Sequence, residues 1–255
     1  MDEVKQTAEF YERFWEKEDY QLAYAFDSAV RDRFPAILQV WGQLRSPHRV
    51  LDYGSGNGVL TSWMYANGFG NELVGIDISQ AGVKYAARTF GKSEVVFKTF
   101  QPGEALDHLG CFDVVVSSHV LEHVAHPESS LAQMIPLSEW FVLEVPLEEC
   151  VVQKCLSACG RNRLSNPVGH VNFWTKKKFR SFLQSCGLFV VRDFHYASAP
   201  FSQFNNLFKR ILERAALHML GISLYGQFMA THYAVLAHRH PAWRTYLEQR
   251  KGVAI

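Results

Sequence analysis

The chain alternates between short apolar runs and amphipathic stretches through most of its length. From residue 49 to about residue 194, runs of strand length are separated by segments whose apolar residues recur every three or four positions. The runs that predict strands are 49–53, 73–77, 94–99, 112–117, 140–145 and 188–195. The segments that predict helices are 59–66, 80–90, 129–135 and 175–186. This alternation favours a mostly parallel sheet covered by helices on both faces.

Both ends of the chain add helical patterns. Residues 201–220 predict an amphipathic helix, and a last strand follows at 231–238. Basic residues beside the apolar set leave contact with a membrane or carrier protein open, but a packed lid is the favoured structure. Within a single domain we expect an N-terminal helical lid (1–46), an α/β core (47–200), a helical lid insertion (201–229), and a last strand with a tail (230–255).

A glycine-rich turn follows the first predicted strand. The sequence VLDYGSGNG occupies residues 50–58, and the next predicted strand ends at Asp77. Glycines allow the backbone to approach a ligand closely, and an ionised carboxylate at that strand tip can accept two ribose hydroxyls. A nicotinamide fingerprint would need glycine where the chain has Val59, so the spacing excludes that class.

The turn resembles motif I of the class I S-adenosylmethionine-dependent methyltransferases. Later motifs follow in that family's order: VGIDIS, FDVVVSSHVLEHVAHP, WFVLEVPLE and GHVNFWTKKKFRSFLQSCGLFVVRDF. The resemblance covers residues 49–195 and has the pattern of small-molecule methyltransferases. It implies an α/β, Rossmann-like, seven-stranded and mostly parallel sheet with an antiparallel last strand. It also implies S-adenosylmethionine as the cofactor.

The resemblance implies which residues hold the cofactor. The glycines would pass along its methionine part, Asp52 would meet its ammonium group, and Asp77 its ribose. Family members often place an Asp after the third strand to bind adenine, but here Gln101 and Glu104 are the candidates. The predicted cofactor-binding residues are Asp52, Gly54, Gly56, Gly58, Asp77, Gln101, Ser118 and Tyr11.

Three histidines lie where an acceptor would be activated. His119 and His123 follow the fourth predicted strand, and His170 follows the fifth, at the edge where open α/β sheets bind ligands. Histidine can act as a general base at neutral pH for a hydroxyl or protonated amine, so these three are the candidate catalytic residues. The other eight histidines, His232 included, are expected at the surface or in satisfied positions, with His195 kept in reserve.

The same segment leaves a metal site open. Small-RNA 2′-O-methyltransferases and some ubiquinone-pathway O-methyltransferases bind a divalent ion with E-x-x-E-H, and this chain has His119, Glu122 and His123 in that pattern. With His170, these residues could hold a divalent transition metal such as Zn, Fe, Mn or Co, which would act as a Lewis acid. A metal-free role for one histidine and a purely structural role are the alternatives.

The composition of the chain limits the kinds of partner and the cellular location that we expect. A net charge of +1 provides no field that would recruit nucleic acid, so a nucleic-acid partner is not expected. No apolar run reaches membrane-spanning length, and the N-terminus is charged and lacks an apolar signal core. Five cysteines without a C-x-x-C pair favour reduced thiols and a cytoplasmic location.

The sequence therefore predicts an enzyme that methylates an oxygen or nitrogen of a small molecule. Two alternatives remain open. The first is metal-assisted methylation, including that of a ribose 2′-hydroxyl, and the second is a cofactor-binding partner protein without transfer activity. The sequence predicts neither the acceptor nor the oligomeric state.

Overall fold

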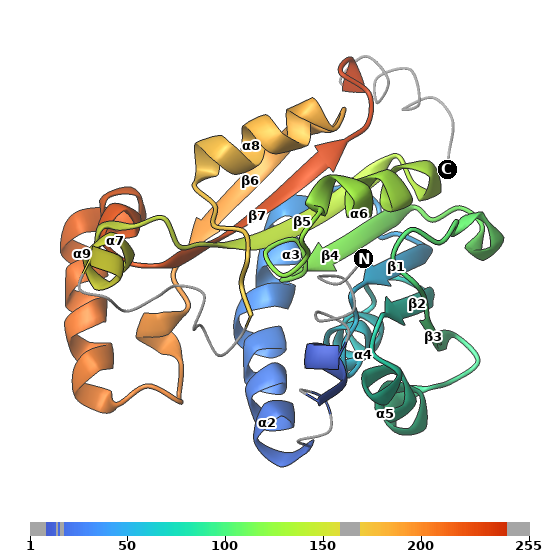
Figure 1. Ribbon diagram of the computed structural model, residues 1–255, viewed down its shortest axis with the longest axis horizontal. Coiled ribbons are helices and arrows are strands. Elements are labelled where there is room, and N and C mark those ends of the chain that lie inside the picture. Colours follow the sequence, from blue (N-terminus) through green and yellow to red (C-terminus); the bar gives the residue numbers. More distant parts are fainter. Residues whose placement is uncertain (1–8, 14, 16–17, 159–168, 244–255) are drawn as a thin grey trace.

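A computed structural model describes residues 9–13, 15, 18–158 and 169–243 (Figure 1). Seven strands form one sheet in the order β3-β2-β1-β4-β5-β7-β6. The strands are β1 (Arg49–Tyr53), β2 (Glu72–Asp77), β3 (Val95–Thr99), β4 (Val114–Ser118), β5 (Trp140–Leu147), β6 (Phe189–Tyr196) and β7 (Thr231–His238). β7 is antiparallel to β5 and β6, whereas the other neighbouring pairs are parallel. The predicted fold class is confirmed.

Helices cover both faces of the sheet. They are α2 (Glu18–Ser28), α3 (Phe34–Trp41), α4 (Val59–Ala66), α5 (Gln80–Phe90), α6 (Pro127–Met134), α7 (Val151–Ala158), α8 (Lys176–Ser185) and α9 (Leu207–Phe228), with a π-helical turn, Ala29–Arg33, between α2 and α3. Val114 and Val116 of β4 face the core formed with α3 and α4, and Val115 faces the core formed with α6 and α8. This alternation explains why the first three residues of β4 are all valine, whereas the strand ends in Ser117 and Ser118.

The structure differs from the expectation for residues 201–229. α9 begins at Leu207, where the Asn206 side chain accepts a hydrogen bond from the Lys209 N–H (2.9 Å), and a non-helical residue, Gly221, interrupts it. α9 lies beside α7 at one end of the molecule (Figure 1). None of the residues 201–229 lines the central cavity described below, so the covering position expected for this segment is not seen. α7 falls in a stretch for which no helix is predicted.

The carboxyl ends of the parallel strands meet at one edge of the sheet. The antiparallel direction of β7 brings its first residues to that edge, because Pro146 of β5 pairs with His232 of β7. In open α/β sheets this edge is where ligands bind. In the part of the chain that the structure describes, no helix has the length and hydrophobicity that a membrane crossing requires.

Candidate active site

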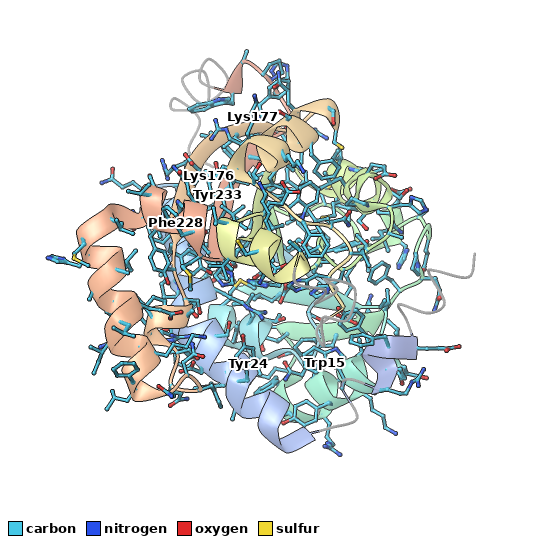
Figure 2. The ribbon with its side chains drawn as sticks, turned by 60° about the vertical axis from the view of Figure 1, so that its left-hand side comes forward. Trp15, Tyr24, Lys176, Lys177, Phe228 and Tyr233 are labelled. Carbon is cyan, nitrogen blue, oxygen red and sulfur yellow. The ribbon has the colours of Figure 1, made fainter. Side chains whose placement is uncertain are left out.

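A cavity of about 1420 Å³ lies at this edge. The turn after β1 and the end of β2 line one part of it, and residues after β4 and β5 and at the start of β7 line another. Phe10, Tyr11 and Trp15 of the N-terminal segment also line it, as does Tyr24 of α2, and Figure 2 labels Trp15 and Tyr24. The cavity therefore joins the predicted cofactor turn to the predicted catalytic histidines.

The glycine turn has a backbone that other residues rarely adopt. Gly54, Gly56 and Gly58 have φ values of 83°, 53° and 78°. A Cβ atom at Gly56 would lie 2.5 Å from the Trp15 ring, so Trp15 packs directly on the turn. Asp77 holds the turn in place: its Oδ2 accepts a hydrogen bond from the Gly56 N–H (2.8 Å).

Two buried carboxylates flank the turn. Asp52 is 2% exposed, and its Oδ2 accepts a hydrogen bond from the Thr61 hydroxyl (2.5 Å). Burial raises the pKa of Asp52 to about 6. Burial also raises the pKa of Asp77, although hydrogen bonds from the Ser79 and Gly56 N–H groups oppose this. A cationic ligand group in the cavity would favour the ionised form of both residues.

The N-terminal segment contacts both parts of the cavity. The Glu12 carboxylate accepts hydrogen bonds from the Ser79 hydroxyl (2.8 Å) and the Ala81 N–H (3.0 Å) at the start of α5. The Tyr11 ring lies edge-on to His123, with 5.3 Å between centroids, and burial raises the pKa of Tyr11. Tyr11 thus lines the cavity beside His123, and its role in covering the cofactor stays a prediction.

The other two predicted cofactor-binding residues differ in position. Ser118 lines the cavity and donates a hydrogen bond to Glu144 Oε2 (2.7 Å). Gln101 is exposed and is absent from the cavity lining, and its backbone N–H donates to Glu104 (2.8 Å). Phe100 next to it does line the cavity. The structure therefore gives Gln101 no contact with the cavity.

His119 lies between two buried carboxylates. It follows β4 with a φ of 58°, which is strained for a residue with a Cβ. Its Nδ1 lies 3.2 Å from Glu122 Oε1, and its Nε2 lies 3.3 Å from Glu144 Oε1. Burial lowers the pKa of His119, but the two carboxylates outweigh this effect and raise it to about 9. His119 is therefore a cation at neutral pH.

The neighbouring imidazoles are neutral. Burial lowers the pKa of His123 to about 4 and that of His232 to about 3. His232 Nδ1 lies 3.2 Å from His119 Nε2, and its ring stacks on Tyr196, with 5.2 Å between centroids. Tyr196 donates a very short hydrogen bond to Glu144. At neutral pH the site thus offers one fixed positive charge and neutral nitrogens that can accept protons.

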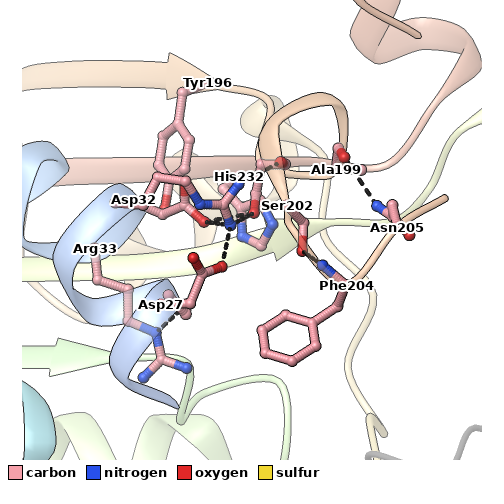
Figure 3. A network of polar contacts seen from close by, with 12 residues as sticks. Asp27, Asp32, Arg33, Tyr196, Ala199, Ser202, Phe204, Asn205 and His232 are labelled. Atoms are coloured by element: carbon pink, nitrogen blue, oxygen red, sulfur yellow. Dashed lines mark hydrogen bonds and ion pairs between the residues drawn. The ribbon is translucent and has the colours of Figure 1, made fainter. Parts of the chain in front are cut away.

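A further polar network lies at the cavity wall, where Asp32 and Ser198 are among the lining residues. Arg31 of the π-helical turn contacts Asp32 (2.7 Å) and donates to the Ser198 carbonyl (3.2 Å). Asn205 donates to the Ala199 carbonyl (2.8 Å) (Figure 3). These bonds fix the segment after β6 against the N-terminal helices, and so fix Tyr196 at the cavity wall.

Glu122, His123 and His170 form a group that could hold a metal ion, with one ligand atom of each within 4.8 Å of the others. Both carboxylate oxygens of Glu122 are buried: Oε1 lies 3.2 Å from His119 Nδ1 and 3.7 Å from His123 Nε2, and Oε2 has no hydrogen-bond partner among the described residues. His170 Nδ1 lies 2.7 Å from Glu148 Oε2, which leaves Nε2 as a possible ligand. These residues fit a divalent metal. His119, Glu144 and His232 form a second such group, but Ser118 and Tyr196 already donate to Glu144.

The sequence did not identify every residue of the site. His232, expected at the surface or in a satisfied position, is half-buried beside His119 and lines the cavity. An available signal was its place at the start of the expected antiparallel strand, which brings it to the ligand edge. Glu144, inside the apolar β5, had the signal of a charge in a buried strand. His195, kept in reserve, contacts Thr231 Oγ1 (2.9 Å) and does not line the cavity.

Comparison with known proteins identifies the family. A family model described as a methyltransferase domain matches residues 14–192. A ubiquinone biosynthesis O-methyltransferase of Thiobacillus denitrificans is 37% identical over 98 residues, which cover 36% of this chain and 41% of that protein.

Solved structures share the fold. A SAM-dependent methyltransferase from Anabaena variabilis is 13% identical, with a TM-score of 0.63, and the match covers 91% of this chain and 95% of that one. Another, from Thiobacillus denitrificans in complex with S-adenosyl-L-homocysteine, is 17% identical with a TM-score of 0.52, over 87% of this chain and 99% of that one. The chain therefore belongs to the methyltransferase domain family, whose members are S-adenosylmethionine-dependent methyltransferases of the class I fold.

Proposed function

We propose that the chain transfers the methyl group of S-adenosylmethionine to an oxygen of a small-molecule acceptor. The observation that carries this proposal is the shared cavity, which the glycine turn and His119, His123 and His170 all line. Nitrogen is the other acceptor atom that the sequence left open. Oxygen is favoured because the similar ubiquinone biosynthesis enzyme is named as an O-methyltransferase. A cytoplasmic location stays a prediction.

The residues would divide the work between binding and chemistry. Gly54, Gly56, Gly58 and the carboxylates Asp52 and Asp77 would hold the cofactor, with Tyr11 and Ser118 beside it. Methyl transfer needs nucleophile, methyl carbon and sulfur in line, and positioning of this kind can contribute about 7–11 kcal/mol. A hydroxyl acceptor must also lose its proton.

The charge states favour His123 as the base. A protonated His119 cannot accept a proton, but it can orient the acceptor or stabilise the oxyanion that forms. His123 is neutral. Its Nδ1 lies 3.5 Å from the Gly169 carbonyl, and its Nε2 lies 3.7 Å from Glu122 Oε1, which is beyond hydrogen-bond distance and so leaves Nε2 able to accept a proton. A positioned base contributes about 100- to 10,000-fold in rate.

The test is S-adenosylhomocysteine formation with a panel of phenols, amines and carboxylates. We expect His123→Ala to lower kcat for a phenolic acceptor by at least about 100-fold while cofactor affinity is retained. His108→Ala is the matched control, because His108 is exposed and does not line the cavity. Tight cofactor binding without turnover on any acceptor would instead favour a cofactor-binding partner protein.

A second candidate, metal-assisted methylation, is favoured by Glu122, whose buried carboxylate has an oxygen within 4.8 Å of a ring nitrogen of both His123 and His170. Glu122, His123 and His170 would hold the ion, with His119 beside them, and a bound transition metal would lower the pKa of an acceptor hydroxyl. A ribose 2′-hydroxyl belongs to this class of acceptor. Elemental analysis of tag-free protein, purified without chelators, tests this candidate.

Near-stoichiometric metal should be present in the parent and in His108→Ala, and should be lost in the double variant His123→Ala, His170→Ala. The parent should also unfold at a lower temperature after chelation, because a bound ion stabilises the folded state. Metal-free parent protein with an unchanged unfolding temperature would contradict this candidate but leave the first one standing.

A further inference from the structure

Helix α9 presents its apolar side chains to solvent. Leu207, Phe208 and Met219 are 69%, 70% and 77% exposed, and Ile211 and Leu212 are more than half exposed. We call these five residues the outer face of α9. Their spacing places them on one side of the helix. An outward apolar face of this size on one helix marks an interaction surface.

The inner side of α9 is unusually polar. Glu213 is only 7% exposed, and Arg210 Nε is buried without a hydrogen-bond partner among the described residues. An amphipathic helix that packs on a core normally turns its apolar side inward. α9 does the reverse, so its pattern fits an apolar environment outside the molecule.

The charges on α9 identify the kind of partner. Lys209, Arg210 and Arg214 are basic, and Glu213, its one acidic residue, faces inward. Apolar side chains bordered by cations are the pattern of helices that lie on anionic bilayers. A two-fold contact with a second copy would instead bring the same cations together.

The outer face continues toward the cavity. Phe204, three residues before α9, lies edge-on to Tyr24, with 5.5 Å between ring centroids, and Tyr24 lines the cavity. Figure 3 shows Phe204 in the same view as Tyr196 and His232. On the other side, Val151 and Val152 of α7 are 45% and 39% exposed. Apolar residues therefore extend from the cavity wall to α7.

We propose that α9 is a membrane-interface helix that seats the protein on an anionic lipid bilayer through its outer face. The apolar side chains enter the headgroup–acyl boundary, and Lys209 and Arg214 contact lipid phosphates. The helix does not cross the bilayer. In this orientation the part of the cavity lined by Tyr24 lies close to the lipid surface.

The test is co-sedimentation of the full chain with vesicles of phosphatidylcholine, with and without phosphatidylglycerol. We expect binding to the anionic vesicles that weakens as salt rises. The double variant Phe208→Ser, Met219→Ser should bind at least about tenfold more weakly, because two exposed apolar side chains no longer enter the lipid. Lys209→Gln should weaken binding about fivefold.

Leu38→Ser is the matched control, because Leu38 is 45% exposed on α3 and lies outside the proposed surface. Its vesicle binding should equal that of the parent. Three results would overturn the proposal: no sedimentation of the parent at low salt, equal binding by the double variant, or a solution dimer that the double variant dissociates. None of these measurements depends on methyl transfer, so the membrane proposal can be refuted without refuting the proposed function, and the reverse also holds.

Discussion

At the scale of single residues, surroundings decide chemistry more than residue type does. His119 and His123 are four residues apart, yet carboxylates raise the pKa of His119 to about 9, whereas burial lowers that of His123 to about 4. One imidazole is therefore a charged donor and the other a neutral acceptor. Both remain catalytic candidates, but with different roles.

Asp77 gives a residue-scale prediction. Its two oxygens accept separate hydrogen bonds from the Gly56 and Ser79 N–H groups. Asn has one acceptor oxygen, so Asp77→Asn should leave one buried N–H without a partner and lower stability by about 1–3 kcal/mol. Cofactor affinity should fall about 10- to 100-fold in calorimetry. The exposed Asp107→Asn should change neither, and an unaltered affinity in Asp77→Asn would remove Asp77 from the cofactor site.

The raised pKa of Asp52 leads us to predict that cofactor binding depends on pH. In the proposed function the cofactor's ammonium group would pair with ionised Asp52, and burial raises the pKa of this carboxyl to about 6 in the free protein. The ionised fraction falls as pH drops below 6, so affinity at pH 5 should be about tenfold lower than at pH 7. Asp52→Asn should bind more weakly and lose this dependence. An unchanged pH profile in the variant would assign the titration to another group.

At the scale of elements, the side chains that cap the first turns of helices stabilise the fold, and one of them also contacts the N-terminal segment that lines the cavity. The Ser79 hydroxyl caps α5 by accepting from the Gly82 N–H (3.1 Å) and donates to Glu12 of the N-terminal segment. Thr175 caps α8 in the same way, by accepting from the Lys178 N–H (3.1 Å), and neither Ser79 nor Thr175 lines the cavity. The two caps therefore form a matched pair.

We expect Ser79→Ala and Thr175→Ala each to lower the free energy of unfolding by about 1–2 kcal/mol, measured with urea. Only Ser79→Ala should also weaken cofactor binding and speed hydrogen exchange in residues 9–13, because the Ser79 hydroxyl also donates to Glu12 of the N-terminal segment. Equal cofactor affinities in both variants would show that this segment does not contribute to binding.

Helices and strands were predicted correctly where the sequence pattern was compatible with a single structure. The strand 49–53 has the predicted bounds because it is a short apolar run that ends at the glycine turn. The helices 59–66 and 80–90 have the predicted bounds because a clear period follows Gly58 in one and Ser79 in the other. The prediction that the segment 201–229 forms a lid stays a prediction, although none of its residues lines the cavity. Its amphipathic pattern identified a helix, but a pattern cannot say whether the apolar side meets a core or an outside partner.

At the scale of the whole molecule, one sheet carries both parts of the cavity. The cofactor turn follows β1, and the histidines follow β4 and β5 or begin β7, with continuous cores above and below. Ligand binding at one part should therefore stabilise the entire fold.

Saturating S-adenosylhomocysteine tests this. At 100 times its Kd it should add about 2.7 kcal/mol and raise Tm by roughly 5–10 °C in a single calorimetric transition. The double variant Phe208→Ser, Met219→Ser should show the same shift, because neither residue lines the cavity. A second transition that the ligand leaves unshifted would mean that part of the chain unfolds separately.

The sequence by itself determined what is local or periodic. Strand and helix patterns predicted the sheet, and the glycine spacing predicted a cofactor turn, because φ and close approach restrict such positions to glycine. Order along the chain predicted which histidines lie near the ligand edge.

Only the tertiary structure decided what depends on contacts between distant strands. β7 brings His232 to His119, β5 places Glu144 under both, and these contacts determine which imidazole is charged. The outward apolar face of α9 is likewise a matter of packing. Charge and exposure depend on neighbours in space, and the sequence records only neighbours along the chain.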